Sequence, residues 1–107
     1  MNGNSINRVE LQGRVGTVRI QNAGGCVVAS FSVMTEETYK ATDGTVLCET
    51  TWHHVTAWKG KDVLLEGLER GALVHVEGRI RNSMYTASDG TERGYMEVMA
   101  SSLKVLE

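Results

Sequence analysis

Hydrophobic and polar residues alternate over much of the chain, and glycine-containing breaks separate the alternating runs. Because successive side chains of a β-strand point to opposite faces, a period of two predicts strands that bury one face and expose the other. Such runs occupy residues 6–20, 26–35, 50–61, 72–86 and 93–106. The positions predicted to face a shared core are Val9, Leu11, Gly13, Val15, Val27, Ala29, Phe31, Val33, Val55, Ala57, Val74, Val76, Gly78 and Ile80.

The run at residues 50–61, TTWHHVTAWKGK, contains both tryptophans of the protein, Trp52 and Trp58. Alternation places the two indoles on one face and Val55 on the other, and only the Val55 face can complete a core. The tryptophan face is then a candidate outer surface for stacking flat ligands, and the lysines that follow it suit an anionic backbone. The alternative is that one or both tryptophans belong to the core, since tryptophan is highly buried on average.

One segment, residues 61–71 with the sequence KDVLLEGLERG, is predicted to be helical. Its apolar residues recur at helical spacing, and Gly71 stands where a C-terminal glycine cap belongs. We expect a short helix that packs against one end of a barrel. Its apolar stripe consists of Val63, Leu64, Leu65 and Leu68.

Two Asp-Gly pairs, at residues 43–44 and 89–90, predict the turns of two long β-hairpins. Tyr39 lies on the arm of the first hairpin. In the second hairpin, a turn centred on the Asp-Gly pair places Tyr85 opposite Tyr95. Both arms therefore carry an aromatic residue.

The composition indicates one soluble domain spanning residues 1–107, because a chain of this length can bury a sufficient core without staples. Twelve glycines, no proline and many short strands favour an all-β barrel or sandwich. No apolar run is long enough to cross a bilayer, and the N-terminus does not resemble a signal peptide, so we expect a cytoplasmic protein without a membrane partner.

Charge and cysteine content limit which partners, metals and disulfides can be expected. The formal net charge is −2, so attraction to a nucleic acid has to come from a local group of cations. Cys26 and Cys48 lack metal-ligand spacing, and the first hairpin separates them by about 30 Å, which is too far for a disulfide. We expect no cofactor, no metal and no small-molecule substrate.

An enzyme is the rival class, and its best candidates are His53 and His54 with Glu49 or Asp62 nearby. Adjacent residues of a strand point to opposite faces, so the two imidazoles cannot share one metal ion or one substrate within a subunit. The sequence therefore favours a binding protein over an enzyme.

Three strands, one helix and two strands follow one another in the order of an oligonucleotide-binding (OB) fold, a five-stranded Greek-key barrel. The chain also closely resembles the DNA-binding domain of bacterial single-stranded DNA-binding proteins. The resemblance runs from about residue 7 to the C-terminus and rests on the segments INRVELQGRVG, CVVASFSVMTEETYK, ETTWHHVTAWKGK, GALVHVEGRIR with MYTASDGTERGY, and MEVMASSLKVL.

The resemblance implies roles for particular residues. It implies that Tyr39, Trp52, Trp58 and Tyr85 stack on bases, and that His53 lies near a contact between subunits. It implies a homotetramer, with a dimer as the less favoured state, that coats single-stranded DNA in replication, recombination and repair in the nucleoid. From their positions we expect backbone phosphates to be contacted by Lys40, Lys59, Lys61, Arg79, Arg81, Arg8, Arg14 and His54.

The sequence also departs from the pattern of the family. The connection VGTVRIQNAGG is short, His54 stands where a basic residue often follows the Trp-His pair, and the chain ends at KVLE without a glycine-rich linker and acidic tip. The alternative function that stays open is a protein-interaction barrel or adaptor related to primosomal proteins, which uses the same fold.

Overall fold

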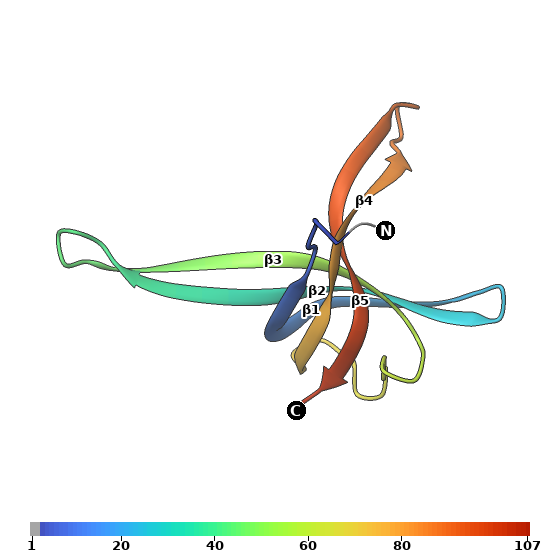
Figure 1. Ribbon diagram of the computed structural model, residues 1–107, viewed down its shortest axis with the longest axis horizontal. Coiled ribbons are helices and arrows are strands. Elements are labelled where there is room, and N and C mark those ends of the chain that lie inside the picture. The colour runs from blue at the N-terminus through green and yellow to red at the C-terminus, as the bar shows by residue number, and fades with distance from the viewer. Residues whose placement is uncertain (1–2) are drawn as a thin grey trace.

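The computed structural model describes residues 3–107, which form one closed barrel of five long strands (Figure 1). The barrel order is β1-β2-β3-β5-β4, and β4 pairs with β1 to close it. All pairs are antiparallel except β3 with β5, which is parallel and joins only Val55 to Val98 and Thr56 to Met99. The strands are β1 (Val9–Ala23), β2 (Cys26–Lys40), β3 (Val46–Trp58), β4 (Leu73–Thr86) and β5 (Glu92–Val105). The predicted all-β, OB-like barrel is therefore confirmed.

Much of the core consists of inward positions that the alternating pattern predicts. Phe31 and Val33 of β2, Val55 of β3 and Val76 of β4 are at most 1% exposed. β5 contributes Leu103, which is fully buried. Burying one face of each strand stabilises the barrel by roughly 1.5–3 kcal/mol for each large apolar side chain.

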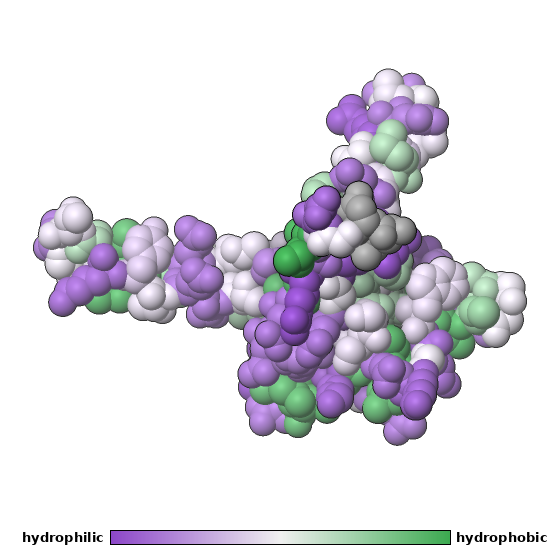
Figure 2. Space-filling model, viewed as in Figure 1, coloured by the Kyte–Doolittle hydropathy of each residue, from purple (hydrophilic) through white to green (hydrophobic). Residues whose placement is uncertain are grey.

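The two hairpins with Asp-Gly turns, one from β2 and β3 and one from β4 and β5, extend from the barrel as arms in different directions, and the β1–β2 hairpin projects on a third side (Figure 1 and Figure 2). Both turns form where the Asp-Gly pairs predict them. Gly44 and Gly90 have φ angles of +89° and +85°, a conformation that glycine adopts without steric cost. Asp43 accepts hydrogen bonds from the backbone and side chain of Thr45, and Asp89 does the same for Thr91. Each carboxylate thus fixes its turn.

The first hairpin also confirms the predicted separation of the two cysteines. Cys48 pairs with Thr38 near the tip of the arm, whereas Cys26 begins β2 at the opposite end. Both thiols are free and exposed.

The predicted helix at residues 61–71 is wrong, and the described residues 3–107 contain no helix. This segment pairs with β5 instead: Leu103 donates to the carbonyl of Asp62 at 2.9 Å, and Val63 forms β-bridges to Gly60 and Leu103. A φ angle of +79° at Gly67 interrupts any helical course. The segment still packs against the barrel, because Val63 and Leu68 are buried in its core.

A second correction concerns Ile80, which was predicted to be buried and is 41% exposed. The register between β4 and β5 shifts at Glu77/Gly78, where β5 has one extra residue. A side chain on Gly78 would collide with the backbone of Met99, so only glycine permits this close crossing. Beyond Gly78 the strand leaves the barrel for its arm, and the face that continues from the core is open to solvent.

Another bulge lies in β1, at the glycines that interrupt its alternating pattern. Between Val15 and Val18 the register against β2 shifts by one residue. Gly13 precedes the bulge and Gly16 lies within it. A side chain on Gly13 would collide with the backbone of Met34. The bulge turns β1 around the barrel wall.

Candidate nucleic-acid interface

The outer face of β3 presents both tryptophans to solvent. Trp52 is 58% exposed and Trp58 is 44% exposed, whereas Val55 and Ala57 between them are buried. The register against β2 is continuous from Val28–Trp58 to Lys40–Val46, so the two indoles share a side of the sheet. The predicted orientation is therefore confirmed, and the alternative of core tryptophans is wrong.

Trp52 rests against the bulge of β1. Its ring atom Cζ3 lies 2.5 Å from the place that a Cβ on Gly16 would take. Beside it, the Oγ of Ser32 accepts a hydrogen bond from the backbone amide of Thr17 at 2.9 Å, and this bond holds β1 to β2 next to the indole. Arg70 lines the same shallow hollow. The sequence did not point to Arg70, because Arg70 lies within residues 61–71, whose helical spacing does not predict the irregular path of the backbone.

A second aromatic group joins β3 to the arm of β4 and β5. The rings of Tyr85 and Tyr95 meet edge to face, with centroids 5.8 Å apart. The imidazole of His54 meets Tyr95 in the same manner at 6.0 Å, and the three rings line a shallow pocket. Tyr95 is therefore an aromatic member of the candidate interface, between His54 and Tyr85.

The predicted opposition of the two tyrosines is wrong by two residues of register. Tyr95 pairs with Ser83, and Tyr85 pairs with Arg93. The tyrosines are diagonal neighbours on one face, at a separation that aromatic side chains still span. The turn is centred on Asp89 itself, which accounts for the difference.

Glu97 forms the buried polar centre of this face, at 5% exposure. It accepts hydrogen bonds from Arg81 at 2.8 and 3.0 Å, from Ser83 at 2.9 Å and from Thr56 at 3.0 Å. Burial raises the pKa of Glu97, but these hydrogen bonds and the Arg81 charge outweigh it and hold the pKa below its ordinary value. The network joins β3, β4 and β5, and sequence reasoning assigned it no role.

The network changes the interpretation of Arg81. Its guanidinium binds Glu97 in the structure, although the side chain remains 42% exposed. Arg14 is also paired, with Glu107 at 2.7 Å and with the carbonyl of Gly71 at 3.2 Å, and so ties β1 to the C-terminus. Both arginines therefore stabilise contacts between segments of the barrel, and a phosphate contact would be additional to that role.

The remaining predicted phosphate contacts are exposed. Within residues 3–107 none of them forms an ion pair with an acidic group. Lys59 and Lys61 directly follow Trp58, and Arg79 lies on β4 near its exit from the barrel. The unpaired predicted cations are Arg8, Lys40, Lys59, Lys61 and Arg79.

Tyr39 and His53 lie apart from the tryptophans. Tyr39 pairs with Leu47, and strand alternation puts this pair on the side of His53. Tyr39 is 50% exposed near the tip of the arm. His53 is half-buried, and its Nε2 is hydrogen-bonded to Thr35 Oγ1 at 2.8 Å.

The two adjacent histidines do not form a common site. His53 contacts Thr35 on one side of the hairpin, whereas His54 contacts Tyr95 on the other. This separation agrees with the argument from alternation against a shared metal or substrate.

Among the described residues, no helix is long and apolar enough to span a membrane.

Comparison with known proteins agrees with this geometry. Residues 6–106 match the model of the single-strand binding protein family. The single-stranded DNA-binding protein of Neisseria meningitidis serogroup A is 37% identical over 106 residues, which cover 95% of this chain and 60% of that protein. The mitochondrial single-stranded DNA-binding protein 1-A of Xenopus laevis is 33% identical, with coverages of 92% and 75%. The chain thus spans less than two thirds of the Neisseria relative.

Two solved structures have the same fold. One is described as a Plasmodium falciparum SSB complex with ssDNA, with a TM-score of 0.83, 27% identity and full coverage of both chains. The other is a deletion mutant of the single-stranded DNA binding protein from Thermus aquaticus, with a TM-score of 0.77 and 21% identity. With a family match over nearly its whole length, the chain belongs to the single-strand binding protein family.

Proposed function

We propose that this chain binds single-stranded DNA with little sequence preference, by stacking bases on exposed aromatic rings. The observation that carries the proposal is the exposure of Trp52 and Trp58 on one outer face of β3. Every base has a π-face, so each stacked base contributes about 1–3 kcal/mol whatever its identity. The rings of His54, Tyr95 and Tyr85 continue the aromatic surface onto the neighbouring arm.

Charge supports the same proposal. The protein carries a net charge of −2, so it has no general attraction for a polyanion. Two of the unpaired cations, Lys59 and Lys61, nevertheless follow Trp58 within three residues. We assign phosphate contacts to them and to Lys40, Arg79 and Arg8, because cations without acidic partners remain available for phosphates. Binding then serves to coat and protect single strands in replication, recombination and repair.

We further propose assembly into a homotetramer through the side of the β2–β3 hairpin that carries His53. Beyond the barrel this hairpin is a ribbon of two strands, and such ribbons are marginally stable alone and leave unpaired edges. The partly buried His53–Thr35 pair lies on the face opposite the tryptophans. Assembly through that face leaves the stacking face open to DNA.

Titration with oligo-dT, followed by intrinsic tryptophan emission, tests the proposed function. Stacked bases are expected to quench the emission of Trp52 and Trp58 strongly and to saturate at a fixed number of nucleotides per chain. An oligo-dA titration should give comparable quenching, because stacking tolerates any base. Failure to bind either oligonucleotide would refute the proposal and would favour the protein-interaction barrel.

A further inference from the structure

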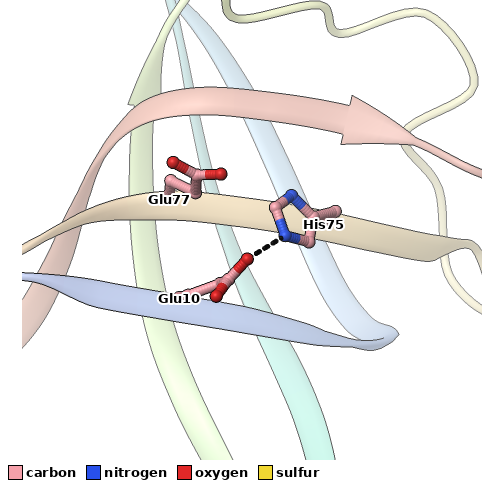
Figure 3. A group of neighbouring side chains, drawn as sticks. All are labelled: Glu10, His75 and Glu77. Carbon is pink, nitrogen blue, oxygen red and sulfur yellow. Dashed lines mark hydrogen bonds and ion pairs between the residues drawn. The ribbon is translucent and has the colours of Figure 1, made fainter.

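A cluster of three potential metal ligands lies where β1 pairs with β4 (Figure 3). Glu10 comes from β1, and His75 and Glu77 come from β4. Glu10 is the direct cross-strand partner of Glu77, and His75 is two positions before Glu77 on the same face. Figure 3 shows the three side chains gathered beside these two strands. Their nearest donor atoms all lie within 4.8 Å of one another.

One carboxylate of this cluster has no partner among the described residues. Oε2 of Glu10 is hydrogen-bonded to Nε2 of His75 at 2.7 Å. The carboxylate of Glu77 has no ion pair or hydrogen bond with any residue in the described part of the chain. Two carboxylates directly opposite each other on paired strands destabilise the pair, unless a cation lies between them. Lys104 is the cross-strand neighbour of His75 on β5, and it forms no ion pair there within residues 3–107.

We propose that Glu10, His75 and Glu77 bind a divalent transition-metal ion such as Zn²⁺. One imidazole and two carboxylates are a donor set that this ion accepts, and three protein ligands leave a position for water or for another group. Ligands about 2.1 Å from a tetrahedral ion are about 3.4 Å apart, so the side chains need only small rotations from their present positions. His75 and Glu77 are half-buried on paired strands, which limits the freedom they lose on binding.

The site is separate from the two tryptophans, although Arg8 and Arg79, to which we assign phosphate contacts, lie two positions from Glu10 and Glu77. In the barrel order β1-β2-β3-β5-β4, β3 is flanked by β2 and β5, so the β1–β4 pair lies across the barrel from it. Metal binding therefore does not depend on stacking by Trp52 or Trp58. The ion would join the first strand to the fourth and so reinforce the contact that closes the barrel.

Calorimetric titration with Zn²⁺ tests the proposal. Exposed thiols such as Cys26 and Cys48 can bind zinc as thiolates, so the titration uses a Cys26→Ser, Cys48→Ser background. One Zn²⁺ per chain is expected to bind saturably. His75→Ala and the isosteric Glu77→Gln should each weaken this binding at least about tenfold, since even indirect partners of metal ligands have effects of that size.

The matched control is His54→Ala, which removes an exposed histidine elsewhere and should leave zinc binding unchanged. Zn²⁺ should also raise the melting temperature of the background protein and not that of Glu77→Gln, and EDTA should reverse the rise. Absence of binding, or binding that persists in both His75→Ala and Glu77→Gln, would overturn the proposal. Because Glu77→Gln should quench normally with oligo-dT, failure of the metal site is distinguishable from failure of DNA binding.

Discussion

The edge of the Trp52 indole occupies the space in which a side chain on Gly16 would begin. The aromatic surface thus depends on a glycine of a different strand, at the bulge of β1. A methyl group at Gly16 cannot coexist with the present position of this ring, but the ring can move outward because Trp52 is exposed. The bulge therefore determines where the indole lies without contributing a functional group.

We predict that Gly16→Ala weakens binding to oligo-dT by about 1–3 kcal/mol, the contribution of one stacked base, because it displaces the indole. The free energy of unfolding should change by less than the binding free energy does. Fluorescence titration and urea unfolding of the same variant measure the two quantities. Gly13→Ala is the control, because its methyl group collides with the backbone of Met34 and should destabilise the fold by about 1–3 kcal/mol. Unchanged binding by Gly16→Ala would show that the position of Trp52 does not matter.

A second prediction separates stacking from charge. Trp52→Ala and Trp58→Ala should each cost about 1–3 kcal/mol of binding free energy at low and at high salt. Lys59→Ala should instead reduce the slope of log affinity against log salt by about 0.7, the contribution of one phosphate on a single strand. Titrations at several salt concentrations provide both values. If the cost of the tryptophan substitutions disappeared at high salt, the proposed division of the binding free energy between stacking and charge would be wrong.

A third prediction concerns acid stability. The pKa of Glu97 is held below its ordinary value of 4.5, so its ionised form stabilises the fold at pH values above that range. This stabilisation should be lost as the pH falls through the lowered pKa. Glu97→Gln should destabilise the protein at neutral pH by about 1.5–3 kcal/mol, because it removes the charge from these hydrogen bonds. It should also make the free energy of unfolding fall less between neutral and acid pH.

Urea unfolding between pH 3 and pH 7 measures the effect. Ser83→Ala is the matched control, since it removes one hydrogen bond and leaves the carboxylate and Arg81 in place. Its cost should be smaller, about 1 kcal/mol. Equal pH profiles for Glu97→Gln and the unmodified protein would show that Glu97 does not set the acid limit.

A fourth prediction tests the proposed assembly. His53→Lys should place a charge in the face that we assign to subunit contact, and should lower the molecular mass on dilution in sedimentation experiments. Tryptophan quenching per chain should persist, because His53 and the indoles lie on opposite sides of β3. His54→Lys, one residue further along, is the control and should keep the mass. A His53→Lys protein that retains its full mass at nanomolar concentration would remove this residue from the interface.

The buried face of each strand could be predicted because alternation is a local property of the chain. Phe31, Val33, Val55 and Val76 are buried as the pattern indicates, and the same reasoning predicts the exposed indole of Trp52. Both Asp-Gly turns could be predicted for a similar reason, since their geometry depends on only a few neighbouring residues.

The incorrect predictions depend on contacts distant in sequence. The segment at residues 61–71 has helical spacing, but its backbone is paired with Leu103, which no local pattern reveals. The exposure of Ile80 follows from the register shift at Gly78 and from the departure of the arm, which are properties of two strands together. The partners of Glu97 of β5 come from β3 and β4, and their convergence required the closed barrel.

The parallel junction of β3 and β5 has the fewest paired residues in the barrel wall, with only Val55–Val98 and Thr56–Met99. Side chains reinforce it from outside, through the Thr56–Glu97 hydrogen bond and the contact of His54 with Tyr95. A strand of DNA lying across these aromatic rings would span the junction with the fewest paired residues, where we expect local opening of the barrel to be easiest. Ligand binding and barrel closure would then be thermodynamically linked, so a bound single strand would slow the exchange of amide hydrogens on the two strands that it bridges.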